Sequence, residues 1–171
     1  MKKFIKEWGS TIIIAVVLSV VCRTYIAEAV VVPTGSMLPT VQLQDRLIVN
    51  KMMNPDNLKD GDVVVFYPPL SGIEKNERYI KRLIGKGGET IEIKDHTLFR
   101  NGKKVDEPYL SEPMNYNYGP VTVPKGKFFF LGDNRNESYD SHLWPSPFVD
   151  KDKIIGKAEV TYFPFSDMKK F

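Results

Sequence analysis

The stretch TLFRNGKKV, Thr97–Val105, carries the clearest signal for the fold. Two strand-like arms flank Asn101-Gly102, and both of these residue types tolerate the positive φ of a two-residue β-turn. The stretch therefore predicts a β-hairpin, and short apolar runs between turn residues recur along the rest of the chain.

Six further runs are typical of short strands because they are rich in β-branched and aromatic residues and are bounded by turn residues. They are RLIVN (Arg46–Asn50), DVVVFY (Asp62–Tyr67), RYIKRLI (Arg78–Ile84), TIEIK (Thr90–Lys94), KFFFLG (Lys127–Gly132) and IIGKAEVTYF (Ile154–Phe163). No long segment with helical periodicity follows residue 30. The pattern predicts a mainly β body of curled antiparallel sheets, with Lys103–Pro124 as an extended surface excursion.

The amino-terminal segment has a different character. A basic start, MKKFIKEWGS, precedes the apolar run TIIIAVVLSVVC, which Arg23 closes. The strict run is short for a membrane span of about 20 residues, but it is long enough from Trp8 onward if Arg23 snorkels to the headgroups. We therefore expect a cytoplasmic segment 1–7, a transmembrane anchor 8–27 and an extracytoplasmic body 28–171, because basic residues favour the cytoplasmic side.

A cleavable secretory signal is the alternative. The small-x-small triplet Ala27-Glu28-Ala29 follows the apolar run at the position of a cleavage site. Arg23 and Glu28 are charges just before this site, and they weaken that interpretation. Both alternatives place the body outside the cytoplasm.

Composition excludes several kinds of chemistry. The 171 residues suit one domain with a real core and carry 24 Lys+Arg against 21 Asp+Glu, a formal charge of +3. The first 28 residues contribute +2, so the body is too nearly neutral to favour nucleic acid as a partner. With one cysteine and two histidines, neither an intrachain disulfide nor a Cys/His metal cluster is expected, and we expect no cofactor.

Ser36 in PTGSMLPT is the first candidate for chemistry. Gly35 allows a tight turn and the flanking prolines stiffen it, so an exposed serine here suits a nucleophile. A serine is inert without a base, and a plain turn serine is the simpler interpretation when the stretch is taken alone.

Lys81 in RYIKRLIG is the second candidate. Strand alternation places Lys81 with Tyr79 and Leu83, on the opposite face from Arg78 and Arg82. Desolvation on that less polar face would lower the lysine pKa and leave a neutral amine that accepts a proton. The alternative is a solvated lysine on an exposed strand.

The third candidate is the polar loop GDNRNESYDSHLW, Gly132–Trp144. It follows an aromatic strand and is dense in hydrogen-bonding groups that could orient catalytic residues. The alternative is an ordinary polar loop at a strand end.

Together, and in this order behind an apolar amino-terminal segment, these motifs resemble the type I signal peptidases. The similar boxes are PTGSMLPT, DRLIVNK (Asp45–Lys51), RYIKRLIG (Arg78–Gly85) and GDNRNESYDSHLW, so the resemblance spans nearly the whole chain. It implies a compact bacterial form with one anchor and a signal-peptidase-like catalytic β-domain.

The resemblance also implies residue roles. Ser36 matches the nucleophile and Lys81 the general base, with the Ser36 amide and the Thr34 hydroxyl forming the oxyanion hole. Ser138 matches the hydroxyl that orients the lysine. Further positions match an ionic framework (Asp133, Arg135 and Asp140, with Arg82) and a residue lining the substrate cleft (Met37).

Two departures from the family pattern stand out. His142 occupies the position of the usual arginine partner of Asp140, which predicts a less stable loop rather than lost chemistry. The usual Gly-Leu-Pro-Gly-Asp turn is replaced by Gly85-Lys86-Gly87-Gly88-Glu89, which is more flexible.

By resemblance, the partners are signal peptides of exported preproteins and the lipid bilayer, at the cell membrane. The expected reaction is cleavage after a small-x-small motif through an acyl-enzyme, with the substrate bound as an added β-strand. Repressor-type autoproteases are a rival class, but they need a DNA-binding module. A non-catalytic β-domain that binds peptides is the rival outside the enzymes. Oligomeric state, the preproteins cut and self-cleavage near Ala29 stay open.

Overall fold

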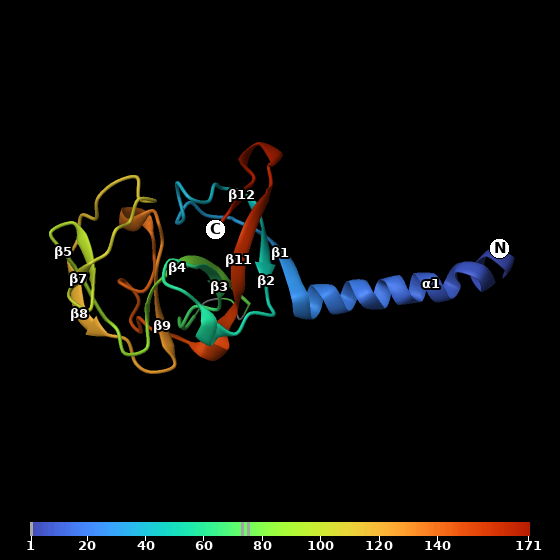
Figure 1. Cartoon of the computed structure of the whole chain (residues 1–171), viewed down its shortest axis with the longest axis horizontal. Helices are drawn as coiled ribbons and strands as arrows, with labels where there is room; N and C mark the ends of the chain where they lie inside the picture. Colours follow the sequence, from blue (N-terminus) through green and yellow to red (C-terminus); the bar gives the residue numbers. More distant parts are fainter. Residues whose placement is uncertain (1, 73, 75) are drawn as a thin grey trace.

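The computed structural model describes residues 2–72, 74 and 76–171, with side chains from residue 8 onward. Helix α1 (Lys2–Val21) continues into a π-helical turn, η1 (Cys22–Ile26), and projects away from the β body (Figure 1). Within it, Trp8–Ile26 has a mean hydropathy of 1.9 and buries none of its residues against the body. The length and composition of Trp8–Ile26 suit a membrane span. Residue 1 of the expected cytoplasmic segment 1–7 lies outside the described residues.

One large antiparallel sheet forms most of the body. Its strands run in the order β1 (Ala27–Val31), β2 (Arg46–Asn50), β11 (Ile154–Phe163), β3 (Val63–Phe66), β4 (Tyr79–Lys86), β9 (Lys127–Leu131) and β10 (Val149–Asp150), and β12 (Lys169–Lys170) pairs with β11. Short 3-10 turns connect these strands: η2 (Pro55–Asn57), η3 (Arg135–Glu137), η4 (Lys151–Lys153) and η5 (Phe165–Asp167).

A smaller antiparallel sheet lies at the end of the body opposite α1 (Figure 1). Its order is β7 (Lys103–Lys104), β6 (Thr97–Arg100), β5 (Thr90–Lys94) and β8 (Tyr118–Thr122). The predicted hairpin is confirmed, because β6 pairs with β7 through a turn in which Asn101 has φ 52° and Gly102 has φ 73°. The mainly β fold with curled antiparallel sheets is therefore confirmed as well.

Two segments differ from expectation. The excursion predicted for Lys103–Pro124 contains β8, and Met114 and Val123 within it are buried against the small sheet. The triplet Ala27-Glu28-Ala29 lies in β1, which pairs with β2 over five residues. Both strands are weakly marked in the sequence because glycine, proline, alanine and glutamate are poor strand formers.

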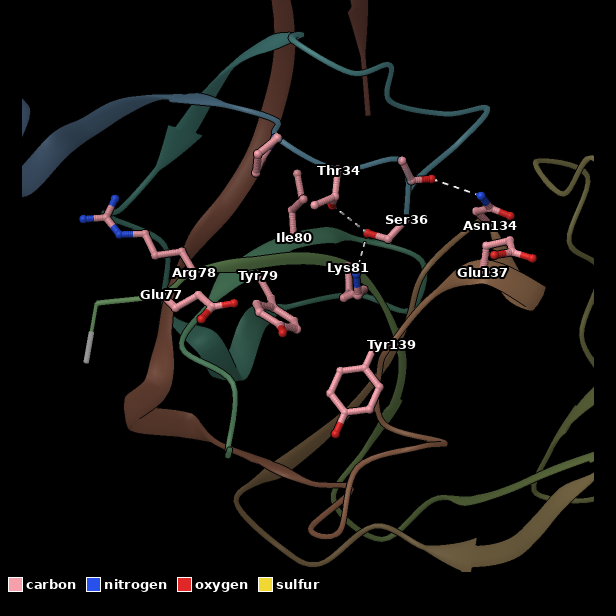
Figure 2. A pocket seen from close by; sticks show the side chains of 12 residues that line it. Thr34, Ser36, Glu77, Arg78, Tyr79, Ile80, Lys81, Asn134, Glu137 and Tyr139 are labelled. Carbon is pink, nitrogen blue, oxygen red and sulfur yellow. Dashed lines mark hydrogen bonds between the residues drawn. The ribbon is translucent and has the colours of Figure 1, made fainter. Parts of the chain in front are cut away.

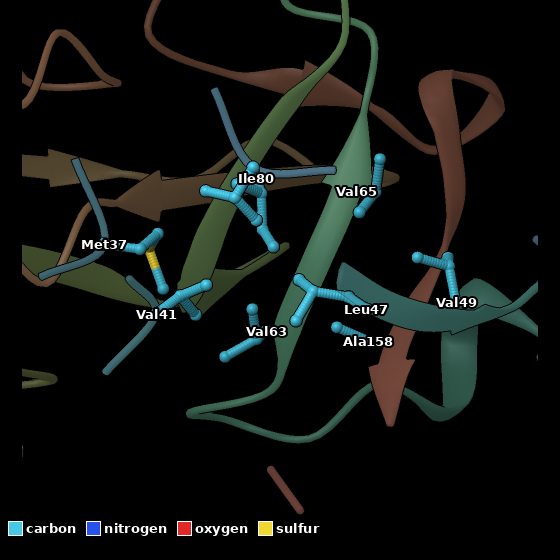
Figure 3. Packing of buried hydrophobic residues seen from close by; sticks show 9 residues of the cluster. Met37, Val41, Leu47, Val49, Val63, Val65, Ile80 and Ala158 are labelled. Atoms are coloured by element: carbon cyan, nitrogen blue, oxygen red, sulfur yellow. The ribbon is translucent and has the colours of Figure 1, made fainter. Parts of the chain in front are cut away.

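The core explains the continuous apolar run of β3. Val63 and Val65 point into one buried cluster, whereas Val64 and Phe66 point into a second cluster on the other face (Figure 3 shows the first). Both faces of the strand are therefore covered, and simple alternation is lost. A third cluster, which includes Ile84 and Phe129 of the large sheet with Ile91 of the small one, joins the two sheets.

Candidate active site

The turn that carries Ser36 is packed against the first core cluster. Val32, Met37 and Val41 are almost fully buried in the first cluster, and the turn closes with hydrogen bonds from Leu38 N to Gly35 O (3.1 Å) and from Val41 N to Met37 O (2.9 Å). Ser36 itself is only 9% exposed. It is less exposed than the sequence suggested, but it lines a cavity.

Lys81 lies in the middle of β4 and is only 4% exposed. Its Nζ is 2.5 Å from Ser36 Oγ, a hydrogen bond visible in Figure 2. Burial lowers the pKa of Lys81 to about 8, although the carboxylates of Asp140 and Asp133 oppose that shift. Tyr79 and Leu83 pack in the second core cluster and Ile80 packs in the first, as strand alternation predicted. Lys81 Nζ lies 5.4 Å from the centroid of the Tyr79 ring. The structure therefore places a partly neutral amine against the serine hydroxyl.

Thr34 stands on the other side of the serine. Its Oγ1 is 3.5 Å from Ser36 Oγ, at the limit of a hydrogen bond, and both hydroxyls face the same cavity (Figure 2). A hydroxyl at this place can donate to an oxygen that develops negative charge beside Ser36.

The polar loop after β9 clamps the serine turn. Asn134 N donates to Ser36 O (3.1 Å), and Asn134 Nδ2 donates to Gly35 O (3.2 Å). A Cβ at Gly132 would lie 2.4 Å from Ser36 O and 2.2 Å from Ser138 Oγ. Only glycine permits this approach, so the loop and the turn form one rigid unit.

Ser138 is buried beside this contact, with 2% exposure. Its Oγ has no hydrogen-bond partner among the described residues, including Lys81. The structure thus brings the hydroxyl next to Gly132 without the contact that an orienting role needs.

The ionic framework is arranged differently from the expected one. Arg82 binds Asp133 through two hydrogen bonds of 2.7 and 2.5 Å, and its guanidinium lies 3.8 Å from the Tyr109 ring centroid. Arg135 pairs instead with Glu107, at 2.9 and 2.5 Å. Glu107 raises the pKa of Arg135, which burial alone would lower. The segment expected to be a surface excursion therefore holds a buried cation of the site.

Asp140 connects His142 to the loop. One carboxylate oxygen lies 2.7 Å from His142 Nδ1, and the other accepts from Gly132 N at 2.8 Å. The His142 ring also stacks on Tyr116, with centroids 4.0 Å apart. The histidine thus occupies the partner position that the expected arginine would have filled.

A cavity of about 540 Å³ opens over the Ser36–Lys81 contact. Backbone and side chains from three segments line it: Pro33, Thr34, Gly35, Ser36, Glu77, Arg78, Tyr79, Ile80, Lys81, Asn134, Glu137 and Tyr139 (Figure 2). Within the described part of the chain, no group of three or more His, Cys, Asp or Glu side chains is placed to hold a metal ion.

Residues 5–163 match the family profile of signal peptidase, peptidase S26. The chain belongs to the signal peptidase family. It is 42% identical to signal peptidase I T of Bacillus subtilis (strain 168), over 96% of this chain and 88% of the relative. It is 43% identical to signal peptidase I P of Bacillus subtilis subsp. natto, over 99% and 94%.

The fold agrees with this assignment. A crystal structure of a signal peptidase I from Enterococcus faecalis V583 is similar, with a TM-score of 0.51 and 33% identity, over 59% of this chain and 96% of that one. The resemblance inferred from the motifs is confirmed. The chain is a serine peptidase of this family, and family membership implies cleavage of signal peptides.

Met37 is the clearest correction among the expected site residues of this signal peptidase. It is fully buried in the first core cluster and is not among the residues that line the cavity. The Met37 side chain packs into the core because burying its apolar surface there stabilises the turn that carries Ser36.

Glu107 and Tyr109 contribute to the site without a role assigned from the sequence. Asn134, in contrast, belongs to the polar loop that was expected to orient catalytic groups. Glu107 and Tyr109 lie more than 20 residues from the serine, lysine and polar-loop motifs, and only the tertiary fold brings them to Arg82 and Arg135.

Proposed function

We propose that this chain is a membrane-anchored serine endopeptidase that removes amino-terminal signal peptides from exported preproteins, cutting after a small-x-small motif. The observation that carries the proposal is the buried hydrogen bond between Lys81 Nζ and Ser36 Oγ, 2.5 Å long. A serine and a desolvated lysine in contact at the base of a cavity form a nucleophile with its own base.

In the first step, neutral Lys81 takes the proton of Ser36 while Oγ attacks the scissile carbonyl. The carbonyl oxygen becomes negative and is bound by the Ser36 N–H and the Thr34 hydroxyl. The position of Thr34 Oγ1 beside Ser36 Oγ supports this role, and one such donor typically contributes about 10²–10³ in rate.

In the second step, the Lys81 ammonium protonates the leaving amine, and the acyl chain stays on Ser36 as an ester. The same lysine, neutral again, takes a proton from water as the water attacks the ester. The resulting ammonium then returns that proton to Ser36 Oγ as the acyl bond breaks and the signal peptide is released. A pKa of about 8 suits both directions of proton transfer near neutral pH.

The loop residues hold these groups in place. Arg82 with Asp133, and Asp140 with His142, fix the backbone around Gly132, and Arg135 with Glu107 fixes the same loop from the side of the small sheet. The hydroxyl of Ser138, which is buried and has no hydrogen-bond partner among the described residues, is the group that the family resemblance assigns to orienting Lys81.

We propose further that α1 is a retained single-pass anchor in the cell membrane, with its amino terminus cytoplasmic and the β body extracytoplasmic. Cleavage after Ala29 would divide β1, which pairs with β2 over five residues. A retained anchor is favoured for that reason, and it places the cavity near the bilayer that holds the substrate.

The test uses the full chain in liposomes, incubated with a preprotein that has one small-x-small site. Mass spectrometry of the products is expected to show a single cut after that motif, and Ser36→Ala is expected to abolish it. Ser111→Ala, at an exposed serine, is the matched control and keeps activity. Binding of the preprotein without any cut by the wild type would favour a non-catalytic peptide-binding domain.

A further inference from the structure

A second cavity adjoins the one that contains Ser36 and Lys81. It measures about 380 Å³ and is lined by Pro69, Leu70, Ser71, Tyr79, Tyr139, Pro145 and Ser146. Tyr79 and Tyr139 also line the first cavity, so the two spaces meet at these rings. In Figure 2 the Tyr79 ring lies to the left of Lys81 and the Tyr139 ring lies below it. The two rings therefore border both the cavity over the Ser36–Lys81 contact and the second cavity.

Trp144 supports the two tyrosine rings from the core. Trp144 is 4% exposed and contacts both rings edge-on, with centroid distances of 5.9 Å to Tyr79 and 6.5 Å to Tyr139. Buried Trp144 belongs to the second core cluster, so the rings rest on the body of the domain. Because Tyr79 and Tyr139 are held in this way, they can discriminate between substrate side chains that bind against them.

The described residues that line the second cavity carry no charge. It consists of two tyrosine rings, two prolines, one leucine and two serines. An apolar side chain gains free energy by leaving water in such a place, whereas a carboxylate loses hydration and meets no cation among the described lining residues.

The two ends of the first cavity differ in their relation to the anchor. Arg78 and Glu77 line one end, and Arg78 binds Glu28 of β1 at 2.6 Å. Because β1 follows η1 directly, this is the end nearest the anchor. Asn134 and Tyr139 line the opposite side (Figure 2).

A substrate held in the same membrane by its apolar signal segment therefore enters at the Arg78 end. The chain beyond the cut then leaves past Tyr139. On this basis we propose that the second cavity is a binding site for one of the first two residues after the scissile bond, and that it selects apolar over acidic side chains. This inference rests on the proposed function, since it concerns the leaving part of the same substrate.

The test compares four forms of one preprotein, with Leu or Asp at the first or at the second position after the cut. At one of these positions, wild type is expected to cleave the Leu form with a kcat/KM about tenfold higher, equivalent to about 1.4 kcal/mol. Tyr139→Ala is expected to reduce that preference to about threefold or less. Leu143→Ala is the control, because Leu143 is an exposed residue of the same loop outside the lining set.

A charge placed in the cavity gives an independent outcome. Ser146→Lys is expected to reverse the preference towards Asp, and Ser111→Lys, at an exposed site elsewhere, is expected to leave it unchanged. If wild type cleaves but neither Tyr139→Ala nor Ser146→Lys alters the preference, the second cavity is not the binding site. If wild type cleaves none of the substrates, the proposed function fails and this inference falls with it.

Discussion

The pH dependence of cleavage follows from the burial of Lys81. Desolvation disfavours the ammonium form, so the pKa falls from 10.5 to about 8. The neutral, proton-accepting fraction is then about a tenth at pH 7 and about nine tenths at pH 9. A solvated lysine would be about 0.03% neutral at pH 7 and about 3% at pH 9. The buried base therefore predicts a rise in kcat/KM of about tenfold between these pH values, followed by a plateau. A solvated base predicts about a hundredfold rise and no plateau.

The assay measures kcat/KM for a peptide with one small-x-small site between pH 6 and pH 10 at constant ionic strength. The pH dependence of kcat/KM reports the pKa values of the catalytic groups in the free enzyme. Circular dichroism over the same range shows whether the fold persists. A midpoint near pH 8 agrees with a desolvated Lys81. Activity that still rises through pH 10 in the folded protein would refute the assignment of Lys81 as a buried base, and so would activity that is independent of pH.

Three substitutions test separate parts of the site. Thr34→Val should lower kcat about 10²–10³-fold while Thr34→Ser keeps most activity, measured by steady-state cleavage; equal activity of both would remove Thr34 from the oxyanion hole. Glu107→Ala leaves the buried Arg135 without its carboxylate and should destabilise the domain by about 3–5 kcal/mol in urea unfolding; a change below about 1 kcal/mol would show the pair to be dispensable. His142→Arg should keep or improve activity, because an arginine at this position can still bind Asp140; a large loss of cleavage would contradict this account of the loop.

The sequence predicted those parts of the fold that local chemistry determines. The two arms of the 97–105 hairpin and the strands Arg46–Asn50, Thr90–Lys94 and Ile154–Phe163 lie where the residue pattern placed them. Their turn residues and β-branched runs act over a few positions, so no tertiary information was needed. β8 was missed because Tyr118-Gly119-Pro120 reads as a turn, and it is a strand only because β5 offers it a partner.

The candidate site shows the same division. The pairing of Ser36 with Lys81, 45 positions apart in the sequence, was implied by the resemblance to the signal peptidases and is present as a contact in the structure. The partner of Arg135 could not be read from the motif, because Glu107 lies in a segment without recognisable strand or helix pattern. Met37 was misplaced because a motif does not show which way its side chains point.

Replacement of the base tests the central claim most directly. The measurement is the single-turnover rate of acylation at pH 8.5, in liposomes, for wild type, Lys81→Ala and Lys81→Arg. Arginine keeps the positive charge but does not lose its proton in this range. The account predicts that both variants fold as wild type does and acylate at least about 10³-fold more slowly, since neither can accept the Ser36 proton. An acylation rate within tenfold of wild type in either folded variant would contradict it.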